Sequence, residues 1–146
     1  MYELRKLYAD DIIEIKDNLV ESRDSSLLMT ILTCLVPAPL SCIHFPEPAY
    51  AYLKDNKVVA CCGAVKIDGF WDVWILMSKN FSCFTRARAI MAFKSKLNEI
   101  GGLARIGIPS DLPNGRKYAE FLGGKFIRSE TSRLFAGVTN DIYEVA

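Results

Sequence analysis

The alternation of apolar and polar positions divides the first part of the chain into one strand and two helices. Residues Tyr2 to Leu7 alternate with the period of two that is typical of a strand. The apolar residues from Ile12 to Val20 form a broad helical stripe, and those from Ser22 to Leu35 form a second one. Because proline interrupts a helix, we expect Pro37 and Pro39 to end this second helix.

Three strands are predicted in the middle of the chain. Ala49–Leu53 and Lys57–Lys66 are joined by the turn dipeptide Asp55-Asn56, and Val73–Ser78 follows a second turn at Asp68-Gly69. The strand Lys57–Lys66 is apolar on both of its faces. It is therefore predicted to lie in the interior of a sheet.

The last part of the chain alternates helices and strands. A long basic helix is predicted over Thr85–Ile100 and a short buried strand over Leu103–Ile108. A further helix begins after Asp111–Asn114, because this segment supplies a turn and a cap. The remaining predicted strands are Lys125–Glu130, Arg133–Val138 and Ile142–Val145. An alternation of this kind places a helix N-terminus where it can bind a phosphate-bearing ligand.

Length and composition narrow the choice of class. A chain of 146 residues without a linker or repeat is predicted to form a single domain over residues 1–146. Its 18 basic and 17 acidic residues leave a formal charge of +1, so neither nucleic acid nor a membrane surface is expected as a partner. The longest apolar tract is too short to span a bilayer, which predicts a soluble protein.

The cysteines and the single histidine do not form a recognisable metal site. Five cysteines occur without a CxxC pair, and His44 is the one histidine. We therefore expect no metal, and free thiols in a reducing compartment such as the cytoplasm.

The predicted order β-α-α-β-β-β-α-β-α-β-β resembles that of the GNAT N-acetyltransferase superfamily over nearly the whole chain. Lys54–Gly63 is similar to the hairpin of that family, and Tyr118–Phe126 is similar to its "GF" segment. In detail the chain is most similar to the short, diverged GNAT-like internal virion proteins of short-tailed bacteriophages, which share a Trp-bearing fourth strand and a basic third helix. The resemblance implies a mixed α/β sheet with the acyl-CoA N-acyltransferase fold.

The resemblance also implies a site for acetyl-CoA between the fourth and fifth strands, Val73–Ser78 and Leu103–Ile108. Family members hold the pyrophosphate with backbone N–H groups in a Q/R-x-x-G-x-G/A turn, which falls on Ser82–Ala87 here. Ala87 fits this turn, whereas Ser82 replaces the Gln or Arg and Thr85 replaces the first glycine. The cofactor-binding residues implied are Leu76, Met77, Ser78, Ser82, Cys83, Phe84, Thr85, Arg86, Ala87, Arg88 and Asn114.

Two catalytic residues follow from the same resemblance. Family members often protonate the departing thiolate with a tyrosine four residues before the glycine of the "GF" segment. Four residues before Gly123 is Ala119, and Tyr118 is its neighbour in the sequence. A general base is expected near the start of the fourth strand, where Asp72 is the first candidate and Asp68 the second.

Several of these residues also have a purely structural interpretation. Arg86 and Arg88 oppose the helix dipole, so a bound anion would explain them, but they also suit the solvated face of a helix. Trp71 and Trp74 suit a substrate groove or the packing of a sheet face. Cys83, near the helix N-terminus, suits a nucleophile or, more simply, an idle thiol.

Two functional hypotheses remain open. In the first, the protein is an acetyl-CoA-dependent N-acetyltransferase whose partner is an acyl acceptor amine. In the second, the GNAT fold is catalytically inactive and binds a host or phage protein, either in the host cytoplasm or as a virion component. The second hypothesis predicts an exposed apolar patch that includes Phe81, Phe84 or Trp71. The sequence predicts no oligomeric state.

Overall fold

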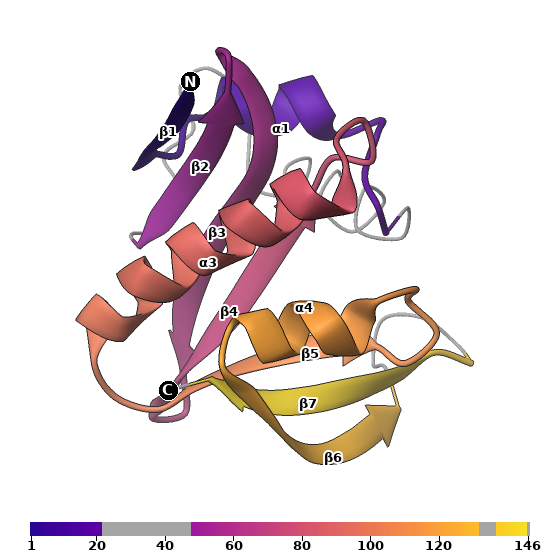
Figure 1. The fold of residues 1–146 in the computed structure, drawn as a ribbon. Coiled ribbons are helices and arrows are strands. Elements are labelled where there is room, and N and C mark those ends of the chain that lie inside the picture. The colour runs from indigo at the N-terminus through magenta and orange to yellow at the C-terminus, as the bar shows by residue number, and fades with distance from the viewer. Residues whose placement is uncertain (22–47, 132–136, 146) are drawn as a thin grey trace, which may run out of the picture. The chain divides into compact units, whose positions relative to one another are not determined.

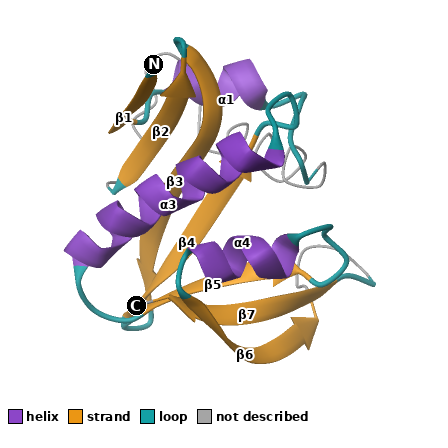
Figure 2. Ribbon diagram, in the orientation of Figure 1, coloured by secondary structure: helices purple, strands orange, loops and turns teal. Residues whose placement is uncertain are grey.

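The computed structural model describes residues 1–21, 48–131 and 137–145 of the chain (Figure 1). Figure 2 shows the strands and helices along it. They are β1 (Tyr2–Lys6), α1 (Ala9–Ile15), β2 (Ala49–Lys54), β3 (Lys57–Ile67), β4 (Phe70–Met77), α3 (Cys83–Ile100), β5 (Ala104–Pro109), α4 (Gly115–Phe121), β6 (Gly124–Thr131) and β7 (Thr139–Val145).

The chain divides into two compact units. The first consists of Met1–Gly63 and Ile75–Ala89, and the second of Ala64–Trp74 and Ile90–Ala146. The elements β3, β4 and α3 each contribute residues to both units.

The strands form a seven-stranded mixed sheet in the order β1-β2-β3-β4-β5-β7-β6. The pairs β1/β2, β2/β3, β5/β7 and β6/β7 are antiparallel, whereas β4 and β5 run parallel. A parallel pair needs a crossover connection, which α3 supplies. The predicted mixed α/β sheet is therefore confirmed.

The first unit is built around β3. Val58, Val59, Cys61 and Cys62 are fully buried, which confirms that this strand has two covered faces. Close packing on both faces excludes water from the backbone and removes apolar area from solvent.

An ion pair holds β1 against α1 in the same unit. The Arg5 guanidinium donates two hydrogen bonds of 2.8 Å to the carboxylate of Asp11, whose Oδ2 also accepts the Tyr8 N–H at 2.8 Å. Asp11 is buried, and the bidentate geometry provides the compensation that a buried carboxylate requires.

The first helix is shorter than the apolar pattern predicts. It ends at Ile15, and Leu19 instead forms an antiparallel bridge with Ser78. The Val20 N–H donates to Met77 O at 2.8 Å, and the Lys79 N–H donates to Asn18 O at 2.7 Å. The prediction of a helix to Val20 was wrong because the end of β4 offers hydrogen-bond partners that local periodicity does not reveal.

In the second unit, helices cover one face of the sheet. The residues Ala104, Ile106 and Ile108 on this face of β5 are buried. A Cβ added at Gly115 of α4 would lie 2.8 Å from Ile108 Cγ2, so this glycine permits close contact between helix and strand. Arg105 points to the opposite face of β5, because side chains alternate along a strand.

The C-terminal strands confirm one predicted boundary and correct another. β6 matches the predicted strand over Lys125–Glu130. The last strand begins at Thr139, whereas Gly137 lies in a turn with a φ of 76°, so the predicted strand Arg133–Val138 does not extend to its end. The rest of that strand, like the predicted helix Ser22–Leu35, lies outside the described residues.

Within residues 1–21, 48–131 and 137–145, each helix is too short or too polar to cross a membrane.

Candidate functional site

The N-terminus of α3 is capped by its own chain. Ser82 Oγ accepts the Thr85 N–H at 3.2 Å, and Ser82 O accepts the Arg86 N–H at 3.0 Å. The Thr85 side chain is 3% exposed and its Oγ1 lies 3.1 Å from Ser82 Oγ. The two residues that depart from the family's turn therefore form a helix cap, and Thr85 is turned into the protein.

The first-turn amides of α3 lie at the exposed side of this cap. The N–H groups of Cys83 and Phe84 precede the first intrahelical bond, which the Arg86 N–H makes to Ser82. The first turn contains no acidic residue, and the Phe84 side chain is 69% exposed. A helix N-terminus of this kind carries a partial positive charge that attracts an anion.

Both arginines of this segment have partners within the protein. The Arg86 guanidinium donates to Phe81 O at 2.7 Å and to Cys83 Sγ at 3.1 Å. The Arg88 guanidinium lies 4.1 Å from the centroid of the Tyr2 ring, and a hydrogen bond to Tyr52 raises its pKa. These contacts explain the two arginines, for which the sequence allowed either a bound anion or the solvated face of a helix.

The end of β4 uses part of its backbone for internal contacts. Leu76, Met77 and Ser78 are buried, and the Ser78 N–H donates to Val59 O at 2.9 Å. Met77 O accepts from Val20, within the segment Asn18–Val20 that pairs with β4. The sequence does not reveal this segment, because its apolar spacing also suits a helix.

The other predicted site residues belong to the second unit. Asp72 lies on β4 and is partly exposed to solvent, and the partial burial of its carboxyl raises the pKa. Asn114 is exposed and left-handed, with a φ of 62°, directly before α4. Tyr118 lies in α4 and is 5% exposed. The residues from Leu76 to Arg88 belong to the first unit.

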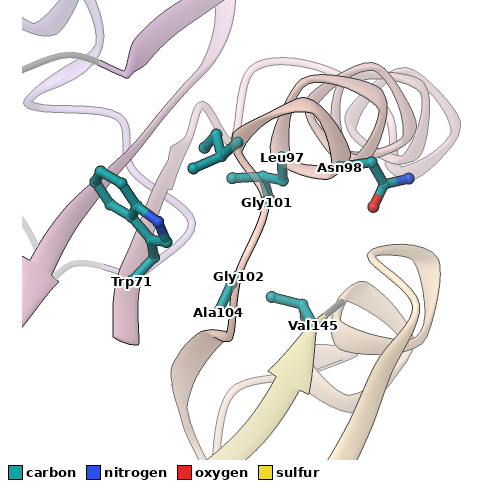
Figure 3. Close-up of a pocket in the computed structure, with 8 residues that line it drawn as sticks. Trp71, Leu97, Asn98, Gly101, Gly102, Ala104 and Val145 are labelled. Carbon is teal, nitrogen blue, oxygen red and sulfur yellow. The ribbon is translucent and has the colours of Figure 1, made fainter. Parts of the chain in front are cut away.

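A small cavity lies in the second unit, and none of these residues is among those that line it (Figure 3). Its volume is about 170 Å³, and Asn98 supplies the one polar side chain of its lining. Figure 3 shows the Trp71 indole beside Leu97 and the Gly101–Gly102 segment. The lining residues are Trp71, Leu97, Asn98, Ile100, Gly101, Gly102, Ala104 and Val145. Trp71 thus packs at the edge of a largely apolar hollow, with the Lys66 ammonium 5.1 Å from its ring centroid.

Several solved structures that are similar to this chain are described as acetyltransferases. A probable acetyltransferase from Staphylococcus epidermidis matches with a TM-score of 0.74 and 14% identity, over 99% of this chain and 98% of that one. An acetyltransferase of the GNAT family from Bacillus cereus matches with a TM-score of 0.64 and 12% identity, over 99% and 96%. The chain has the GNAT fold.

A third GNAT-like structure contains a ligand. A proposed acetyltransferase from Salmonella typhimurium, solved with its cofactor acetyl-CoA, matches with a TM-score of 0.61 and 8% identity, over 98% of this chain and 92% of that one. No protein-family model matches the chain, and no curated protein matches it in sequence. At these identities the likeness shows the GNAT fold and leaves the chemistry to the residues.

Proposed function

We propose that the protein is a GNAT-type N-acetyltransferase that transfers an acetyl group from acetyl-CoA to an amine. The observation that carries the proposal is the N-terminus of α3, which directly follows β4 in a GNAT fold and presents the amides of Cys83 and Phe84 without a nearby acid. The acetyl-CoA in the Salmonella typhimurium structure supports the choice of cofactor.

The residues of this N-terminus fit a pyrophosphate through their backbone. Cys83 and Phe84 supply two N–H donors, and the dipole of α3 adds to their attraction for phosphate. Thr85 does not obstruct these donors, because its side chain is buried against Ser82. In the proposal the backbone from Leu76 to Ser78 contacts the pantetheine arm.

Two side chains carry the proton transfers in the proposed reaction. Asp72 accepts a proton from the acceptor ammonium, directly or through water, which frees the nitrogen lone pair. The thioester of acetyl-CoA then supplies the acetyl carbon, and a C–N bond forms as the C–S bond breaks. The nitrogen loses a second proton to solvent, and the Tyr118 hydroxyl protonates the departing thiolate. Tyr118 then regains a proton from solvent, and Asp72 releases its proton to solvent.

Calorimetric titration of the wild type with acetyl-CoA tests the proposal. Phe84→Glu places a negative charge beside the first-turn amides of Cys83 and Phe84, where it suits the helix dipole but repels phosphate. We expect this variant to bind acetyl-CoA about tenfold more weakly or worse, a loss of roughly 1.4 kcal/mol or more. Met91→Glu is the matched control, since Met91 is 59% exposed on the same helix two turns away, and its affinity should equal that of the wild type.

The same titration separates the proposal from its alternative. A wild type that does not bind acetyl-CoA contradicts the proposed enzyme. Equal losses in Phe84→Glu and Met91→Glu contradict the proposed location of the pyrophosphate.

A second candidate function is binding by a catalytically inactive GNAT fold, as a virion component or a factor that contacts a host protein. The exposed Phe84 ring favours it, because a large apolar side chain at the proposed cofactor site also suits a protein contact. An absence of acetyl-CoA binding in the titration is the result expected from this candidate.

A further inference from the structure

A row of charged residues crosses the sheet of the second unit on the face opposite the helices. Asp72 of β4 is in register with Arg105 of β5, Arg105 with Glu144 of β7, and Glu144 with Lys125 of β6. In-register neighbours project to the same face of a sheet, and adjacent strands lie about 4.8 Å apart. Arg105 therefore lies between two carboxylates.

Within the part of the chain that the structure describes, the Arg105 side chain forms no hydrogen bond or ion pair with Asp72 or Glu144. Its Nε atom is buried and has no hydrogen-bond partner among the described residues. Its guanidinium instead lies 4.8 Å from the centroid of the Phe70 ring. A buried donor without a partner is unfavourable, so a ligand that accepts from this guanidinium would remove a cost already present in the protein.

Asp72 is likewise not engaged by its cationic neighbour. An ion pair with a guanidinium lowers the pKa of a carboxyl, whereas the pKa of Asp72 is raised by burial. Among the described residues no hydrogen bond or ion pair joins the Asp72 carboxylate to the Arg105 guanidinium, although the two residues are in register on adjacent strands and project to one face.

We infer that Arg105 binds the carboxylate of the acceptor while Asp72 faces its amino group, so that the acceptor is a small amino acid. The inference rests on the proposed acetyltransferase function. The two charged groups of an α-amino acid are attached to one carbon and can reach two side chains on adjacent strands together. A planar guanidinium can donate two parallel hydrogen bonds to a carboxylate, and the Phe70 ring lies 4.8 Å from the Arg105 guanidinium carbon.

The test compares amino acids with amines that lack only the carboxylate. Release of CoA thiol is measured with alanine, phenylalanine and lysine, and with ethylamine, phenethylamine and pentane-1,5-diamine. We expect the wild type to prefer the amino acids. Arg105→Gln should raise KM for the amino acids by roughly 10- to 100-fold, because a charged hydrogen-bond donor is lost, and should leave the three amines unchanged.

Two further variants control for charge and for folding. Arg128→Gln removes the same charge from the same face of β6, where Arg128 is in register with Ile142, and should change neither series. Arg105→Lys keeps the positive charge but loses the planar guanidinium that can donate two parallel hydrogen bonds. This variant should therefore have an intermediate KM for amino acids. Far-UV circular dichroism checks that each variant is folded.

Each outcome decides the inference. Equal use of both series by the wild type, or an equal effect of Arg105→Gln on both, overturns it and leaves the acetyltransferase function standing. If no thiol is released with any amino acid or amine, the proposed function fails. Calorimetric titration with the three amino acids then tests, independently of the reaction, whether Arg105 binds a carboxylate. Binding that Arg105→Gln abolishes then supports the site, and an absence of binding to the wild type overturns it.

Discussion

At the scale of single residues, Asp72 shows how the surroundings of one carboxyl connect stability to catalysis. Burial raises its pKa above the ordinary value of 3.8, so the folded protein holds this proton more tightly than the unfolded chain does. A raised pKa suits a general base, because it brings proton affinity closer to that of the group it serves. The same shift makes the ionised carboxylate unfavourable in the folded protein.

The stability of the protein should therefore depend on pH through Asp72. The contribution of this carboxyl is fully present below pH 3.8 and is lost as the pH rises through the raised folded value. We expect the free energy of unfolding of the wild type, relative to Asp72→Asn, to fall as the pH rises above 3.8. Urea unfolding of both proteins at several pH values up to about 7 measures this difference. A difference that stays constant with pH would show that Asp72 is not perturbed.

Serine and threonine at the start of α3 illustrate a second effect at this scale. The family's turn is rich in glycine, so Ser82 and Thr85 at the same positions first suggest that their side chains obstruct a ligand. Ser82 instead accepts the Thr85 N–H, and the Thr85 hydroxyl is buried against it. The identity of a residue at a motif position therefore says little until the direction of its side chain is known.

At the scale of elements, the long helix α3 depends on its cap. Ser82→Ala removes the oxygen that accepts the Thr85 N–H and leaves the buried Thr85 hydroxyl without this contact. We expect a loss of about 1 kcal/mol in the free energy of unfolding, the usual cost of an N-cap serine. Ser95→Ala, at an exposed position within the same helix, should change stability by much less.

Urea unfolding of the two variants beside the wild type provides the measurement. Similar losses in both would mean that the cap contributes nothing beyond the ordinary effect of exchanging serine for alanine. A cap that matters would also tie the proposed phosphate site to the stability of α3, because the same turn presents the amides of Cys83 and Phe84.

At the scale of the whole molecule, the prediction of one domain concerns cooperativity. Two compact units are present, yet β3, β4 and α3 each run through both. Breaking one unit should expose ends of elements that the other needs, so we expect the two units to unfold together.

Natural probes report separately on the two units. Trp71 and Trp74 belong to the second unit, and the buried thiols of Cys61 and Cys62 belong to the first. Tryptophan fluorescence and alkylation of these two cysteines, mapped by mass spectrometry, should give the same urea midpoint. Separate midpoints would instead show that the units unfold independently and would contradict the single domain.

Much of the fold follows from local patterns that act within a few residues. The apolar run of β3, the Asp55-Asn56 turn and the apolar stripe of α3 depend on backbone preferences and on burial of one or two faces, and all appear in the structure near the predicted positions. Asp55 and Asn56 have φ values of 50° and 64°, the conformation that such turn residues tolerate. The order of these elements, together with the segments Lys54–Gly63 and Tyr118–Phe126, carried the resemblance that implied the GNAT fold.

The tertiary structure decided the features that join distant parts of the chain. Leu19 leaves the predicted helix for a bridge to Ser78, Arg88 stacks on Tyr2, and Arg105 lies in register between Asp72 and Glu144. In each case the partner is far away in sequence, so neither periodicity nor a motif reveals it. By itself the sequence determined most of the segments that become strands and helices, because those choices are largely local. The segment Asn18–Val20 is an exception, since its partners lie at the end of β4. Strand register and side-chain direction determined which charges remain available to a ligand, because both depend on partners that only folding brings together.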